Sequence, residues 1–177
     1  MEKRYKVVDS EEVELGRFKI ILDKVEECGN IYPYSYIKMK KSVGVLPICD
    51  NNVLLIRQYR HAVCEYEYEI PGGGLDTDED PKDAAERELF EETGFVADSI
   101  NFLGSYYPSP GSSNEETFLY VAFGHVKSQP VKEPLEYIES EFVKISQMDE
   151  LIAKGKIKHG MGLVAWLHYK EWRDKEC

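Results

Sequence analysis

The sequence predicts an α+β fold, and three observations lead to this prediction. Residues 14–25 and 31–39 alternate apolar and polar, which is the period of β-strands, and several further strand segments bounded by turns follow. A segment in the middle, 80–94, has the caps and spacing of a helix. The last segment, 161–173, carries an apolar stripe at helical spacing. A chain of 177 residues with 42% hydrophobic residues can bury a substantial core around such elements.

The first elements are expected to be two antiparallel strands. Residues 14–25 alternate apolar and polar, and residues 31–39 do so after a turn at 28–30. Two strands alone are marginally stable, so they should pack on the main domain or on a second subunit. We therefore divide the chain into N-terminal strands, 1–40, and a main domain, 41–177.

The main domain is expected to alternate strands with a few helices. Strands are predicted at 42–49, 52–58, 65–70, 101–107, 117–126 and 136–145. Asp50-Asn51 is the turn between the first two. A short helix is predicted at 146–154, ended by Gly155, and the final helix at 161–173 should face the core.

The helix at 80–94 has clear start and stop signals. Asp80 is suited to the N-cap, and Pro81 to the first helical position. Asp83 in the first turn favours the positive end of the helix dipole. Gly94 should end the helix in a left-handed conformation. These signals place the helix just after the glycine-rich turn at 72–74 in the sequence.

Three carboxylates project from one side of this helix. Glu88 is three residues before Glu91 and four before Glu92, so the like charges repel by a few tenths of a kcal/mol per pair. A divalent cation would offset this repulsion, and oxygen ligands without His or Cys favour Mg2+ first and Mn2+ second. The alternative is an acidic, solvated helix face with no metal, which predicts no dependence on Mg2+.

The residues around this helix match a known pattern. Seven residues stand at fixed spacing: Gly73, Glu79, Arg87, Glu88, Glu91, Glu92 and Gly94. Together with bulky Leu89 and Phe95 they resemble the Nudix box, Gly-x5-Glu-x7-Arg-Glu-U-x-Glu-Glu-x-Gly-U, where U is bulky and aliphatic. Only Phe95 departs, because it is aromatic. The resemblance implies a metal-dependent hydrolase of nucleoside diphosphates with a Nudix-type α/β/α sandwich, a mixed β-sheet and an additional N-terminal antiparallel β-sheet.

Residues that flank the box narrow the implied substrate. Gln58-Tyr59-Arg60, the run Glu69–Gly73 and the loop Tyr107–Glu115 are similar to the ADP-ribose pyrophosphatase branch, with Pro110 at the position of its loop proline. The resemblance implies hydrolysis of ADP-ribose to AMP and ribose 5-phosphate. GDP-mannose or another nucleoside diphosphate sugar is the alternative substrate. A binding module for nucleotide sugars without catalysis is the alternative of another class, although it would not need the intact box.

The resemblance also implies roles for individual residues. Glu88 and Glu92 are expected as metal ligands, with Glu91 sharing the site and the carbonyl of Gly72 completing it. Arg87 is expected to orient the glutamates by charge-assisted hydrogen bonds. A general base should come from a glutamate in a loop after the box, a region that contains Glu133, Glu136, Glu139 and Glu141. Glu136 matches the branch best as a carboxylate near the metal, which leaves Glu133 as the base, although the sequence alone does not separate the two.

Substrate contacts are expected from three further regions. The planar fork of Arg60 suits phosphate oxygens, and Glu115 would position water or ribose. In the resembled branch the N-terminal sheet commonly forms part of a homodimer and gives aromatic residues to the adenine site of the partner subunit. Tyr34, between Tyr32 and Tyr36, is the candidate for this stacking, and the alternative is that the three tyrosines only form one face of a strand.

Composition limits the other functions that we expect. The net charge of −11 argues against general binding to nucleic acids or membrane surfaces. No run of eighteen apolar residues and no apolar leader is present, so we expect a soluble, unsecreted protein. The four cysteines are too sparse for a disulfide framework, which favours reduced thiols and a cytoplasmic location. The expected partner is a small nucleotide sugar.

Overall fold

The computed structural model describes residues 4–130 and 138–176. These residues form two units, and each is described by itself. The N-terminal unit comprises Met1–Lys40 and Tyr107–Glu116, and the main unit comprises Lys41–Tyr106 and Thr117–Cys177. The loop 107–116 therefore belongs with the N-terminal strands, although it connects two strands of the main unit.

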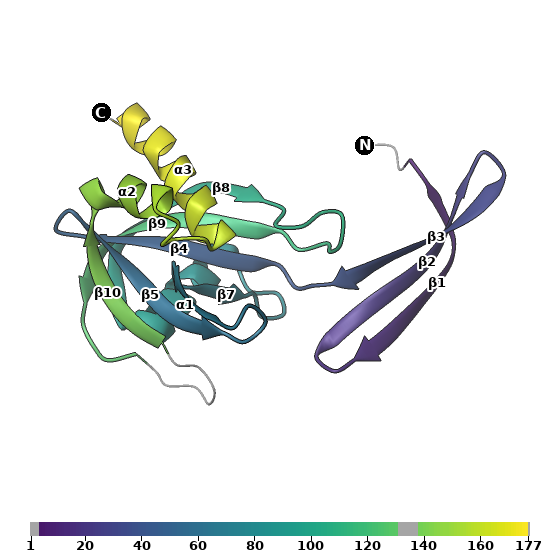
Figure 1. Ribbon diagram of the computed structural model, residues 1–177, viewed down its shortest axis with the longest axis horizontal. Coiled ribbons are helices and arrows are strands. Elements are labelled where there is room, and N and C mark those ends of the chain that lie inside the picture. Colours follow the sequence, from purple (N-terminus) through teal and green to yellow (C-terminus); the bar gives the residue numbers. More distant parts are fainter. Residues whose placement is uncertain (1–3, 131–137, 177) are drawn as a thin grey trace. The chain divides into compact units, whose positions relative to one another are not determined.

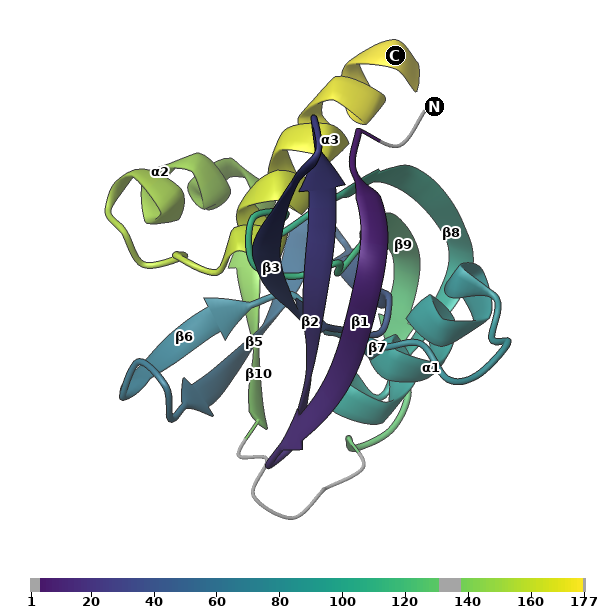
Figure 2. The same cartoon turned by 90° about the vertical axis from the view of Figure 1, so that its right-hand side faces the viewer.

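The N-terminal unit is a three-stranded antiparallel sheet with β2 in the centre (Figure 2). Its strands are β1 (Lys6–Leu15), β2 (Phe18–Glu27) and β3 (Asn30–Lys38). The prediction of only two strands was wrong, because a turn at Gly16 and Arg17 divides the segment 14–25. Every residue of β1 is exposed, so its sequence lacks the apolar alternation by which a half-buried strand is recognised.

The loop 107–116 is fixed to the end of β3. Ile37 N–H donates to the carbonyl oxygen of Ser112 at 2.8 Å, and Met39 N–H donates to Oδ1 of Asn114 at 2.7 Å. Within the loop, Ser112 N–H donates to the carbonyl oxygen of Ser109 at 2.9 Å. These bonds give a chain segment without regular secondary structure a defined shape.

The main unit is built on a seven-stranded mixed sheet. Its strands are β4 (Ser42–Cys49), β5 (Asn52–Arg60), β6 (Glu65–Glu69), β7 (Gly72–Gly74), β8 (Phe95–Tyr106), β9 (Thr117–Val126) and β10 (Ile138–Lys144). The main order is β10-β5-β4-β9-β8, with β6 paired to β5 and β7 paired to β4. The pairing of β4 with β9 is parallel and the others are antiparallel. Seven of the eight residues of β4 are buried, as expected of a central strand covered on both faces.

Helices cover both faces of this sheet (Figure 1). They are α1 (Pro81–Thr93), α2 (Met148–Ala153), preceded by a 3-10 turn at Ile145–Gln147, and α3 (Gly160–Glu176). Ala84, Ala85 and Leu89 of α1 pack on one face. Met148 of α2 and Trp166 of α3 pack in the core on the other face. None of the described helices is both long enough and apolar enough to span a bilayer.

Most predicted elements of the main unit are present, with differences at their ends. The turn between β4 and β5 is confirmed, since Asp50 and Asn51 both have positive φ, 47° and 64°. β8 begins at Phe95, six residues before the predicted 101–107, because register shifts after Ala97 and Phe102 disturb its alternation. The predicted helix at 146–154 begins instead as a 3-10 turn.

The caps of α1 are confirmed. The side chain of Asp80 accepts a hydrogen bond of 2.8 Å from Lys82 N–H, and Pro81 is the first helical residue. Gly94 has φ 67°, and its N–H donates to the carbonyl oxygen of Phe90 at 2.8 Å. The direction and length of α1 are therefore set by local sequence, and this fixes where its glutamates lie.

Candidate functional site

The candidate site lies where β7 leads into α1. Val45 N–H donates to the carbonyl oxygen of Pro71, and Leu75 N–H donates to that of Lys41, each at 2.9 Å. These bonds bracket β7 against β4. A Cβ atom at Gly72 would collide with the carbonyl oxygen of Val43, so only glycine permits this close approach of the two strands.

Gly72 turns both of its backbone polar groups away from β4. In an antiparallel ladder, pairs of facing residues with mutual hydrogen bonds alternate with pairs that have none. Val45 and Pro71 form a hydrogen-bonded pair, so the next pair, Gly44 and Gly72, has no mutual hydrogen bonds. The N–H of Gly72 instead donates to Oε2 of Glu92 at 2.9 Å. Its carbonyl oxygen points to the same side as its N–H, and this is the side that faces α1.

Glu88 lies against the neighbouring glycine. A Cβ atom at Gly73 would come within 2.5 Å of the Glu88 carboxylate, so this carboxylate occupies the space that a side chain would fill. Burial raises the pKa of Glu88 above its ordinary value, and hydrogen bonding to Arg87 opposes that shift. A cation in this position would remove the cost of burying the charge.

Arg87 links the carboxylates of this region. Its Nε and Nη2 atoms donate to the two oxygens of Glu79 at 2.8 and 2.9 Å. Nη1 donates to Glu88 at 2.7 Å and to Glu91 at 3.2 Å. Nη2 also donates to the carbonyl oxygen of Gly74 at 3.2 Å. The bidentate pair with Glu79 is the main cause that raises the pKa of Arg87, so the guanidinium is permanently charged.

These residues fit a hard divalent cation by their chemistry. Glu88 and Glu92 both reach the short strand at Gly72-Gly73, where a carbonyl oxygen faces the same side. All of these possible metal ligands are oxygen atoms, which Mg2+ and Mn2+ prefer. Within residues 4–130 and 138–176, however, no group of three His, Cys, Asp or Glu side chains already stands in metal-binding geometry. Arg87 and the N–H of Gly72 hold the carboxylates instead.

Arg60, the predicted phosphate-binding residue, ends β5 and is paired with a buried carboxylate. Its Nε and Nη2 atoms donate to the two oxygens of Glu69 at 2.7 and 2.6 Å. The side chain of Glu69 is 1% exposed and that of Arg60 is 47% exposed. Sequence reasoning gave Glu69 no role. The sequence feature that could have indicated a role is that Glu65, Glu67 and Glu69 alternate along β6 and therefore share one face of this strand.

Tyr34 and Pro110, two predicted substrate contacts, line one pocket of the N-terminal unit. The pocket has a volume of about 350 Å³ and is lined by Tyr34, Tyr36, Tyr107, Pro110, Ser113 and Asn114. The rings of Tyr34 and Tyr36 have centroids 6.3 Å apart and are tilted by 51°. An aromatic wall with amide and hydroxyl groups nearby suits a flat heterocycle.

The other predicted residues are placed less completely. Glu115 is half-buried in the loop of the N-terminal unit. Glu133 and Glu136, the candidates for the general base, lie outside the described residues. The strand predicted at 136–145 is described from Ile138 onward, as β10.

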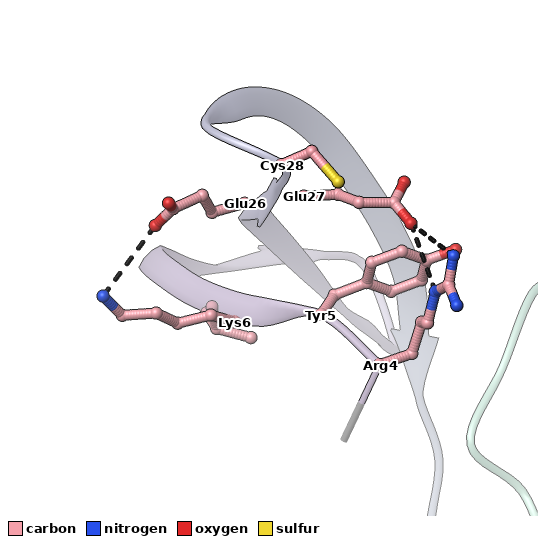
Figure 3. A pocket seen from close by; sticks show the side chains of 7 residues that line it. Arg4, Tyr5, Lys6, Glu26, Glu27 and Cys28 are labelled. Atoms are coloured by element: carbon pink, nitrogen blue, oxygen red, sulfur yellow. Dashed lines mark hydrogen bonds and ion pairs between the residues drawn. The ribbon is translucent and has the colours of Figure 1, made fainter. Parts of the chain in front are cut away.

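A second hollow occurs at the far end of the N-terminal sheet (Figure 3). Its charged groups are already paired, because Arg4 bonds Glu27 at 2.8 Å and Lys6 lies 3.8 Å from Glu26. Tyr5 lines the same hollow (Figure 3). The side chains of Arg4 and Lys6 are 77% and 78% exposed, so this is an open surface rather than a built site.

Comparison with known proteins finds a matching family model and several similar proteins. The NUDIX domain model matches residues 38–163. The methanol dehydrogenase activator of Bacillus methanolicus is 35% identical over 127 residues, which are 70% of this chain and 69% of that protein. The ADP-ribose pyrophosphatase of Bacillus subtilis is 31% identical over 113 residues, 63% of this chain and 60% of that protein. A crystal structure of an ADP compounds hydrolase superposes with a TM-score of 0.88 at 24% identity, covering 98% and 96% of the two chains.

Proposed function

Because the chain belongs to the NUDIX domain family, we propose that it is a divalent-metal-dependent hydrolase of nucleoside diphosphate sugars, with ADP-ribose as its substrate. The observation that carries this proposal is the convergence of Glu88 and Glu92 on the backbone of Gly72-Gly73. The similarity to an ADP-ribose pyrophosphatase supports the choice of substrate. One water adds across the P–O–P linkage, which gives AMP and ribose 5-phosphate.

Mg2+ is the proposed cofactor, with Mn2+ as a substitute. Glu88, Glu92, Glu91 and the carbonyl oxygen of Gly72 would hold it. When bound, such an ion neutralises phosphate charge and lowers the pKa of coordinated water. Arg87 orients Glu88 and Glu91 through Nη1, and Glu79 fixes Arg87 in turn. The exposed part of Arg60 binds the anionic phosphates.

A carboxylate must also accept the proton of the attacking water. We propose that Glu133 or Glu136 does so, because the resembled branch uses a glutamate from this part of the chain. The variants Glu133→Gln and Glu136→Gln separate the two. Loss of the base abolishes the acidic limb of the dependence of kcat on pH, whereas loss of a metal ligand raises the Mg2+ concentration that is needed.

The pocket of the N-terminal unit is proposed to hold the adenine base. Tyr34 offers a ring for stacking, and Pro110 offers an apolar edge. Both side chains were predicted as substrate contacts from sequence. Their place in one pocket supports this role.

We further propose that the N-terminal sheet forms a homodimer. Val7, Leu15 and Ile31 of this sheet are 48%, 67% and 61% exposed, which is unfavourable for a sheet in water. Light scattering across a range of micromolar concentrations tests the dimer. A mass of 20.4 kDa throughout would contradict it. A cytoplasmic location is proposed as well, since Cys28, Cys49 and Cys64 are free thiols.

A substrate panel tests the proposed activity. Phosphate release is measured with a coupled phosphatase and Mg2+ on ADP-ribose, GDP-mannose, UDP-glucose, NADH and diadenosine polyphosphates. We expect preferred turnover of ADP-ribose. Preference for GDP-mannose would keep the reaction and change the substrate. Tight binding of ADP-ribose without turnover of any compound would point to a binding module instead.

A further inference from the structure

The Arg60–Glu69 pair is unusual because one member is buried and the other reaches solvent. The carboxylate of Glu69 uses both oxygens on Nε and Nη2 of Arg60, which fixes the plane of the guanidinium. Burying a charge of this kind is costly unless the charge is paired and hydrogen-bonded. An arginine that only had to bind an anion at the surface would not require a buried carboxylate beneath it.

His159 approaches the same carboxylate from another element. It lies directly before α3, and its carbonyl oxygen accepts from Leu163 N–H at 3.2 Å, so the first turn of the helix holds its backbone. Its Nδ1 atom is 3.5 Å from Oε2 of Glu69. This Nδ1 atom is buried and has no hydrogen-bond partner among the described residues. Oε2 of Glu69 thus lies between the Nη2 atom of Arg60 and the imidazole of His159.

Other charged groups near His159 lie on β6, the strand that carries Glu69, and at Lys158, the residue before His159. Glu67, two residues before Glu69, is 3.2 Å from Nζ of Lys158, and Lys158 also pairs with Glu65. One carboxylate oxygen of Glu67 is buried without a partner among the described residues. Burial lowers the pKa of His159 despite the nearby Glu69. The imidazole is therefore neutral at neutral pH and leaves the full charge of Glu69 to Arg60.

We propose that Glu69 and His159 are positioning residues that hold the guanidinium of Arg60 in its phosphate-binding orientation. This inference rests on the proposed function of Arg60. Glu69 fixes the plane of the guanidinium by two hydrogen bonds, and His159 limits the movement of the Glu69 carboxylate by contact with Oε2. Neither residue needs to touch the substrate.

A double-mutant cycle on ADP-ribose hydrolysis tests this role. Arg60→Ala, Glu69→Gln and the double variant are compared at saturating Mg2+. Because a phosphate-binding arginine contributes to ground-state binding, Glu69→Gln should raise KM by about 10-fold while kcat changes by less than about 3-fold. If Glu69 acts only through Arg60, the double variant loses no more kcat/KM than Arg60→Ala alone.

His159→Gln and a matched control complete the design. Glutamine places an amide group near Oε2 but packs differently from imidazole, so we expect a smaller rise in KM than for Glu69→Gln. Glu65→Gln is the control, because it makes the same change on the same face of β6, and the ion pair that it removes is with Lys158. Thermal unfolding shows which variants are folded.

A measurement without turnover separates this inference from the proposed function. In a 1H–15N spectrum the Nε–H signal of Arg60, assigned with Arg60→Lys, should shift on Glu69→Gln and on His159→Gln but not on Glu65→Gln. If the wild type hydrolyses no substrate, the proposed function fails and the spectrum still decides the positioning. Independent losses in the cycle, an unchanged KM in folded Glu69→Gln, or an unshifted Nε–H signal would each overturn the inference.

Discussion

The backbone N–H of Gly72 donates a hydrogen bond of 2.9 Å to Oε2 of Glu92, twenty residues later in the chain. This bond joins the short strand β7 to the last turn of α1. It exists because Gly72 is in the strand pair without mutual hydrogen bonds and because Asp80 and Gly94 fix both ends of the helix. The position of a proposed metal ligand thus depends on caps and strand register.

Substitutions at two adjacent glycines should have different effects. In Gly73→Ala the new Cβ meets the Glu88 carboxylate, so the carboxylate must move, and we expect kcat to fall by about 10-fold or more. In Gly72→Ala the new Cβ meets backbone atoms of Val43 and Gly44 that cannot move, so the free energy of unfolding should fall by about 1–3 kcal/mol.

Activity assays and thermal unfolding on the same samples check these two outcomes. Gly160→Ala is the control, because a Cβ there meets no atom within 4 Å. Equal effects of Gly72→Ala and Gly73→Ala on both quantities would contradict the different roles that we assign.

Arg87→Lys should disrupt the carboxylate arrangement although the charge is kept. A lysine cannot reproduce the bidentate bonds to Glu79 together with the bonds to Glu88 and Glu91. We expect a loss of unfolding free energy of about 2 kcal/mol, the scale of hydrogen bonds to charged groups. We also expect a higher requirement for Mg2+. Chemical denaturation and a Mg2+ titration of the rate measure the two effects, and a variant with wild-type values of both would exclude this role for Arg87.

Tyr34→Ala should weaken binding of the substrate without slowing the chemical step. Loss of a stacking ring costs about 1–3 kcal/mol, so KM for ADP-ribose should rise by about 10-fold at nearly constant kcat. Tyr32→Ala is the matched control, since Tyr32 stands on the same strand, is 50% exposed and does not line the pocket. The same change in KM for both variants would argue against an adenine site at Tyr34.

The stability of the protein should depend on pH through His159. Its pKa in the folded protein lies below the ordinary value of 6.5, so the unfolded chain takes up this proton first as the pH falls. As the pH falls below 6.5, His159 therefore lowers the free energy of unfolding. This loss grows until the pH reaches the pKa of His159 in the folded protein. We expect the Tm of the wild type to fall more between pH 7.5 and 5.5 than that of His159→Gln. His61→Gln, at an exposed position, should follow the wild type. Parallel curves for all three proteins would show that folding does not lower the pKa of His159.

The sequence predicted best the features that local chemistry determines. The caps of α1 and the Asp50-Asn51 turn were confirmed because each depends on a few adjacent residues with strong conformational preferences. β1 was not recognised, since an exposed strand has no apolar period. The predicted start of β8 was wrong because bulges interrupt the alternation of apolar and polar residues along this strand.

Long-range relationships within the candidate site could not be predicted in the same way. Spacing along a helix placed Glu88 and Glu92 on one side, but only strand register shows that both reach Gly72-Gly73. The partner of Arg60 is Glu69 on the neighbouring strand. His159 reaches the same carboxylate from ninety residues further along the chain, and no sequence period connects the two.

The central claim is that Glu92 carries a catalytic metal ion, and the most direct measurement is the rate of ADP-ribose hydrolysis by Glu92→Gln as Mg2+ is varied. Glu86→Gln is the control, because Glu86 stands on the same helix and pairs only weakly with Lys82 at 3.9 Å. We predict that EDTA abolishes wild-type turnover, that Glu86→Gln keeps it, and that folded Glu92→Gln loses kcat by about 10²-fold or more at the Mg2+ concentration that saturates the wild type. Turnover by Glu92→Gln at the wild-type rate, or a wild-type rate unaffected by EDTA, would contradict the account.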